Sequence, residues 1–159
     1  MTYSPKHVGF ITGMVAIEER VRTAFGAAIG EKPAELKAVL VRFTPGELQT
    51  AVSCAAYICA YIVADVLDGE LPEDGLEVMA QQVVEDNKRW VDLGEVNTVV
   101  SFLKASATGD ARFPGVPDED VAGNSFVIAA SLLSRFRPEG QRWFEYLDSI
   151  WNSAQAADS

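Results

Sequence analysis

Between Ala51 and Ala64 the chain carries fourteen residues in succession without a charge. A helix that is apolar on all sides is normally buried at the centre of a helical protein. The run follows Thr44-Pro45-Gly46-Glu47, which has the spacing of a capping box. In that motif the threonine hydroxyl accepts the Glu47 amide and the glutamate carboxylate accepts the Thr44 amide. Pro45 suits the first helical position. The sequence therefore predicts a central buried helix over about 44–67.

The rest of the chain also has helical rather than strand periodicity, with apolar residues recurring every three or four positions. No strand survives comparison with a helical interpretation, and residues 108–117 form one long loop rich in proline and glycine. We therefore predict a single all-α domain over 1–151, a bundle of six or seven helices, with 152–159 as a frayed tail. The expected helices cover 5–29, 32–43, 44–67, the acidic turn near 73 to about 90, 95–107, 118–136 and 138–151.

The negative charge is concentrated in one segment. The net charge of the chain is −10, and residues 65–95 hold ten acidic and two basic side chains, or −8. Such a field repels nucleic acid and anionic lipid and accelerates encounter with a basic protein. A solvated surface that maintains solubility is the simpler explanation. The predicted partner-binding face consists of Asp65, Asp68, Glu70, Glu73, Asp74 and Glu77.

The two cysteines and the first residues of the sequence predict in which cellular compartment the protein lies. Cys54 and Cys59 are five residues apart, roughly 140° around a helix, so they cannot bond to each other there. Two buried thiols suit a reducing environment. Residues 8–17 are apolar but lead into Glu18-Glu19 without a cleavage site. The apolar run that ends at Asp65 is short for a membrane span. We expect a cytoplasmic protein that does not enter a membrane.

A search for catalytic or metal-binding patterns assigns no catalytic residue, metal ligand or cofactor. His7 is the only histidine and has no partner at a ligand spacing. Glu18 and Glu19 would approach Asp65 and Asp68 if their helices packed together, and Mg²⁺ prefers such oxygen ligands. This arrangement is similar to that of all-α nucleotide pyrophosphohydrolases with glutamate-rich helices. It departs from them at Arg22, where an extended acidic motif would continue.

Aromatic residues form a second candidate surface. Side chains at this helical spacing more often complete a core, but exposed ones would anchor a homodimer interface or line an apolar pocket between helices. The residues concerned are Tyr57, Tyr61, Phe113, Trp143, Tyr146 and Trp151.

These observations favour a non-enzymatic interaction or regulatory domain that binds a basic protein through its acidic segment. In this general sense the chain resembles small acidic helical proteins that neutralise a toxin or an effector. Two alternatives remain open. One is a helical domain that binds a small apolar ligand, and the other is a Mg²⁺-dependent hydrolase of nucleotides.

Overall fold

The computed structural model describes residues 5–68, 72–107 and 119–158, and the side chains of 5–15, 119, 155, 157 and 158 fall outside that description. The described residues form seven helices and no strand, which confirms the predicted all-α bundle. In chain order they are α1 (Pro5–Ile29), α2 (Pro33–Leu40), α3 (Pro45–Val66), α4 (Glu73–Asn87), α5 (Val96–Ala107), α6 (Glu119–Phe136) and α7 (Trp143–Asp158).

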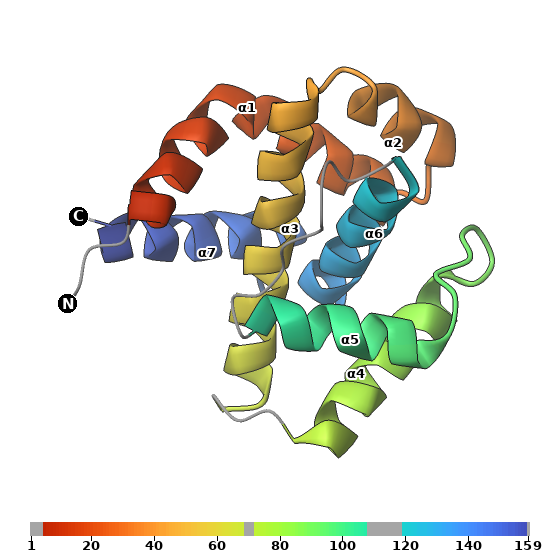
Figure 1. Ribbon diagram of the computed structural model, residues 1–159. Coiled ribbons are helices and arrows are strands. Elements are labelled where there is room, and N and C mark those ends of the chain that lie inside the picture. The colour runs from red at the N-terminus through yellow and green to blue at the C-terminus, as the bar shows by residue number, and fades with distance from the viewer. Residues whose placement is uncertain (1–4, 69–71, 108–118, 159) are drawn as a thin grey trace.

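Helix α3 lies at the centre of the bundle. It packs against α1, α5, α6 and α7, which surround it in Figure 1. Ten of its residues are buried, among them Ala55, Cys59 and Ile62, which are wholly inaccessible to solvent. Small side chains along α3 let neighbouring helices approach closely. The prediction of a central helix over about 44–67 is therefore confirmed.

The capping box at the start of α3 forms as predicted and also fastens α1. The Glu47 amide donates to Thr44 Oγ1 at 3.2 Å, and the Thr44 amide donates to Glu47 Oε1 at 2.9 Å. Arg20 of α1 donates to both oxygens of the same carboxylate, at 2.9 and 3.0 Å. The hydrogen bonds from Arg20, followed by that from the Thr44 amide, lower the pKa of Glu47 to about 2. Glu47 therefore stays ionised down to strongly acidic pH.

The cysteines behave as small hydrophobic residues of the core. Cys54 and Cys59 are both free and buried, in agreement with the prediction that they cannot pair. Burial raises the pKa of both thiols well above its ordinary value. Neither thiol is therefore an effective nucleophile at neutral pH.

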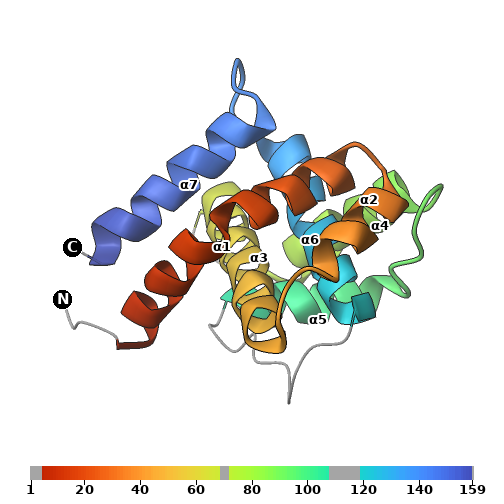
Figure 2. The same cartoon turned by 90° about the horizontal axis from the view of Figure 1, so that it is seen from above.

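Helix α7 begins and ends later than the sequence indicated. A turn precedes it, in which the Gln141 amide donates to the Pro138 carbonyl at 3.0 Å and Gly140 adopts a φ of +84°. Beyond Trp151, where we expected fraying, the helix continues to Asp158 because Ala154 packs into the bundle with 3% of its surface exposed. Helices α1 and α7 lie side by side (Figure 2), and the start of α1 is on the same side of the molecule as the end of α7.

One described helix, α3, is long and apolar enough by composition to cross a membrane. Half of its most apolar eighteen-residue window is buried inside the bundle. The contacts of α3 with its neighbours account for this composition, as expected for the core helix of a bundle.

Candidate functional site

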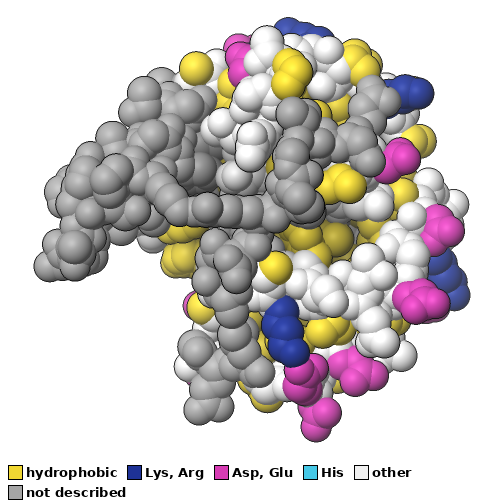
Figure 3. All heavy atoms as spheres, viewed as in Figure 1, with side chains coloured by type: hydrophobic (Ala, Val, Ile, Leu, Met, Phe, Trp, Pro, Cys, Tyr) yellow, Lys and Arg dark blue, Asp and Glu magenta, His cyan; other side chains and the backbone are white. Residues whose placement is uncertain are grey.

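The predicted acidic face lies at one end of the bundle, where α3 ends and α4 begins. Its exposed carboxylates among the described residues belong to Asp65, Asp68, Glu73, Asp74 and Glu77. Figure 3 shows acidic side chains gathered over the start of α4, at the lower end of this view. Glu70 lies outside the described residues. The structure thus brings the five described members of the face to one end of the molecule.

These five carboxylates differ in whether another side chain pairs with them. Glu73 forms an ion pair with Lys104 of α5. Asp65 accepts a hydrogen bond from the Tyr146 hydroxyl at 3.0 Å, and burial together with this bond raises the pKa of Tyr146. Within the described part of the chain, Asp68, Asp74 and Glu77 form no ion pair. Three charges of the face are therefore not neutralised by any cation among the described residues.

The aromatic candidates mainly complete the core. Tyr146 and Trp151 are buried, with 3% and 8% of their surfaces exposed. Tyr57, Tyr61 and Trp143 are half-buried and pack against the same core. Phe113 lies outside the described residues. None of the five described aromatic residues lines the cavity at the ends of α1, α4 and α6.

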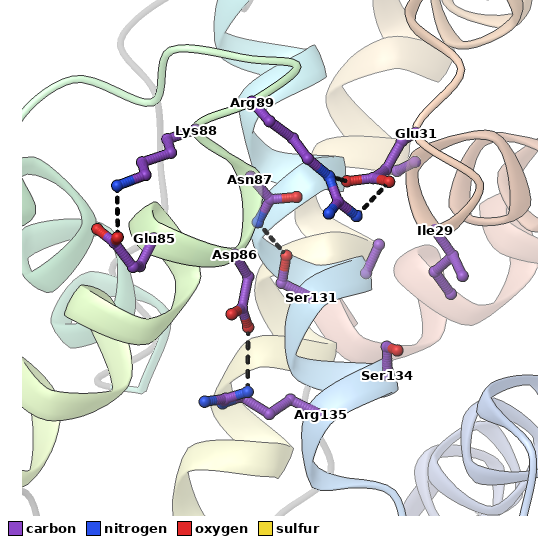
Figure 4. Close-up of a pocket in the computed structure, with 12 residues that line it drawn as sticks. Ile29, Glu31, Glu85, Asp86, Asn87, Lys88, Arg89, Ser131, Ser134 and Arg135 are labelled. Carbon is purple, nitrogen blue, oxygen red and sulfur yellow. Dashed lines mark hydrogen bonds and ion pairs between the residues drawn. The ribbon is translucent and has the colours of Figure 1, made fainter.

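That cavity has a volume of about 680 Å³ and lies where three helices end. Its walls come from the last residues of α1, α4 and α6 and from the turns that follow α1 and α4 (Figure 4). The polar residues around it are Glu31, Glu85, Asp86, Asn87, Lys88, Arg89, Ser131, Ser134 and Arg135. A cavity of this size is in the usual range for small-molecule sites, which occur between helices of bundles.

Two ion pairs between different segments flank the cavity, and a third, between Lys88 and Glu85, lies at the end of α4. Arg89 donates to both carboxylate oxygens of Glu31, at 2.5 and 2.6 Å, and so joins the turn after α4 to the turn after α1. Arg135 of α6 lies 3.3 Å from Asp86 of α4. The hydrogen bonds from Arg89 hold the pKa of Glu31 below its ordinary value. In Figure 4 the two pairs lie on opposite sides of the cavity.

Asn87 is a polar residue of the cavity wall and lies between these two ion pairs. It is buried, with 6% of its surface exposed, and all its side-chain groups are satisfied. Its Nδ2 donates to the Val83 carbonyl at 2.7 Å and to Ser131 Oγ at 2.6 Å, while its Oδ1 accepts from Trp90 Nε1 at 2.9 Å. Asn87 therefore fixes the end of α4, and with it the turn that presents Arg89.

Glu31 occupies an unfavourable position for a carboxylate. It follows the end of α1 with a φ of +57°, in the left-handed region where glycine is usual. The Lys32 amide donates to the Ala27 carbonyl at 2.9 Å and the Glu31 amide to the Ala28 carbonyl at 3.2 Å, the pattern of a Schellman motif. The dipole at this helix end also disfavours negative charge. Helix termination alone therefore does not explain a glutamate at position 31.

Replacing Glu31 separates backbone strain from the ion pair. Glu31→Ala and Glu31→Gly both remove the pair with Arg89, but only alanine keeps a Cβ in the left-handed conformation, which costs about 1 kcal/mol. We expect the glycine variant to melt roughly 2–4 °C above the alanine variant. Thermal unfolding followed by circular dichroism measures the difference. Equal melting temperatures would show that position 31 is not strained.

The structure does not assemble the acidic cluster on which the magnesium alternative depends. No three histidine, cysteine, aspartate or glutamate side chains lie close enough to hold a metal ion within the described residues. Glu18 instead approaches Arg22 on its own helix, at 3.7 Å. The side chain of His7 falls outside the description.

The cavity was missed in the sequence because its walls are far apart in the chain. Residues near 31, 86–89 and 131–135 meet only after three helices have packed. One signal was present: Asn87 occupies a position of the apolar stripe of α4, where a polar side chain needs a buried partner. That partner, Ser131, is forty-four residues away.

Comparisons with known proteins leave the family open: no family model, curated protein sequence or solved structure matches the chain.

Proposed function

We propose that this chain is a non-enzymatic, cytoplasmic interaction domain that binds a basic surface of a partner protein, in the manner of an immunity protein or inhibitor. The partner meets the acidic face at the junction of α3 and α4. The observation that supports the proposal is the group of exposed carboxylates that form no ion pair with any described residue: Asp68, Asp74 and Glu77.

Electrostatics indicates how such a face works. The chain carries a net charge of −10, so its field extends beyond the surface and attracts a basic protein. Exposed charges of this kind mainly raise the association rate, and salt screens them over a Debye length of about 8 Å at physiological ionic strength. A partner of this domain therefore binds more slowly as salt increases.

A triple neutralisation tests the face. In Asp68→Asn/Asp74→Asn/Glu77→Gln the side chains keep their shapes and lose three charges. The control, Glu19→Gln/Glu35→Gln/Glu139→Gln, removes three exposed charges outside the face. We expect wild type and control to retain the same basic protein in affinity capture at low salt, and the face variant to lose it. With the purified partner, stopped-flow association should be at least about tenfold slower for the face variant.

The two triple variants have the same net charge, so a general loss of negative charge affects them equally. Equal association rates for both variants would contradict the acidic-face proposal. So would a captured partner that is acidic, or one whose association rate does not change with salt. Capture of a second copy of this chain would replace the proposal with a homodimer.

A further inference from the structure

We propose that the cavity at the ends of α1, α4 and α6 binds a small zwitterion of the amino-acid type, with one ammonium and one carboxylate group. This site is independent of the acidic face. The two lie at opposite ends of α4, a helix of fifteen residues and hence about 22 Å long.

The charges around the cavity balance. Glu31, Glu85 and Asp86 contribute three carboxylates, and Lys88, Arg89 and Arg135 contribute three cations. A simple anion gains no net attraction here, and the overall charge of −10 opposes it. A ligand that carries both signs can engage a carboxylate and a guanidinium at once (Figure 4).

The helix dipoles affect the cations and the carboxylates around the cavity in opposite ways. A cation near the carboxyl end of a helix is stabilised by the helix dipole, so Lys88 and Arg89 after α4 and Arg135 in the last turn of α6 have a structural reason to be there. The dipole disfavours Glu31 and Asp86 at the same ends. An exposed ion pair contributes only about 0–1 kcal/mol, which offsets this disadvantage weakly. Binding of a ligand ammonium would give the carboxylate of Glu31 a role.

Ser131 offers a donor for the other end of the ligand. Five helical serines, Ser53, Ser106, Ser125, Ser149 and Ser153, donate their hydroxyl hydrogens to the carbonyl one turn earlier. Ser131 differs, because its Oγ accepts from Asn87 Nδ2 and its hydroxyl hydrogen has no acceptor among the described residues. The hydroxyl lines the cavity, as does Arg135 one turn further along α6. Together they supply hydrogen-bond donors for a ligand carboxylate.

The ligand is therefore placed by both ion pairs. Its ammonium lies against the carboxylate of Glu31, on the side of the cavity opposite Arg135 (Figure 4). Its carboxylate receives the Ser131 hydroxyl and those N–H groups of Arg135 that Asp86 does not use. Arg135 Nη1 lies 3.3 Å from Asp86 Oδ2, and the planar guanidinium has further N–H donors that suit recognition of a carboxylate.

Titration with free amino acids tests the site. The twenty common L-amino acids are added one at a time to the full chain, and binding is followed by NMR chemical-shift changes and calorimetry. We expect saturable binding of at least one, with a Kd below about 1 mM. Its N-acetyl derivative and its amide each lack one charge and should bind at least about tenfold more weakly. Absence of binding across the set, or equal binding of the N-acetyl derivative, would overturn the proposal.

Variants locate the binding. Arg135→Gln and Ser131→Ala should each weaken it at least about tenfold, the effect of losing one hydrogen bond to a charged group. Glu31→Gln should weaken binding of the free amino acid more than binding of its N-acetyl derivative, because it removes a partner of the ammonium. Arg142→Gln and Glu35→Gln remove the same charges from exposed positions outside the cavity and should leave the Kd unchanged. Equal effects in variants and controls would place the ligand elsewhere and overturn the assignment.

Discussion

Ala55→Asp is expected to abolish folding. Ala55 lies in the middle of α3, has no exposed surface and belongs to the core. An aspartate there places a carboxylate among apolar side chains, with an effective penalty of several kcal/mol. The total stability of a domain is about 5–15 kcal/mol, so this one change removes a large share of it. Loss of the helical circular dichroism signal and of the compact elution volume would measure the effect.

Ala64→Asp is the matched control. The same substitution falls on the same helix at an exposed position, two residues before its end. Its expected cost is below about 1.5 kcal/mol, from helix propensity and from a negative charge near the carboxyl end. A folded Ala55→Asp variant, or equal destabilisation by the two substitutions, would contradict the central position of α3.

The local features of α3 could be predicted because they depend on neighbouring residues. The capping box needs only Thr44 and Glu47, three positions apart, and both of its hydrogen bonds are present. The ion pair from Arg20 to the same glutamate could not be predicted, since it spans twenty-seven residues and depends on how α1 packs. Local hydrogen bonding therefore determines where α3 starts, whereas tertiary packing determines which residue pairs with Glu47.

The two candidate sites also differ in whether they depend on neighbouring residues or on tertiary packing. The acidic face comes from one continuous segment, so its position followed from the run of carboxylates that ends α3 and begins α4. The cavity depends on three helix ends, and the pair between Glu31 and Arg89 joins residues fifty-eight positions apart. The aromatic residues were ambiguous for a related reason. Spacing places Tyr146 on a helix face, but only packing shows that this face is buried.

Phe126→Ala is expected to cause the second large effect, a loss of about 3–5 kcal/mol of stability. Phe126 of α6 is fully buried and meets Phe25 of α1 edge to face, with ring centroids 5.0 Å apart. Truncation leaves a cavity between two helices that both pack against α3, and such a core relaxes only partly. Chemical denaturation should show the midpoint shift.

Comparison with Phe144→Ala separates core packing from the loss of any aromatic ring. Phe144 also contacts a ring edge to face, that of Trp143 at 5.7 Å, but 39% of its surface is exposed. We expect its truncation to cost less than about 1.5 kcal/mol. A double-mutant cycle of Phe25→Ala with Phe126→Ala should give a coupling of about 0.5–1.5 kcal/mol for the ring pair. Additive losses would show that the two rings stabilise the protein separately, and equal losses at Phe126 and Phe144 would contradict the packing of α1 on α6.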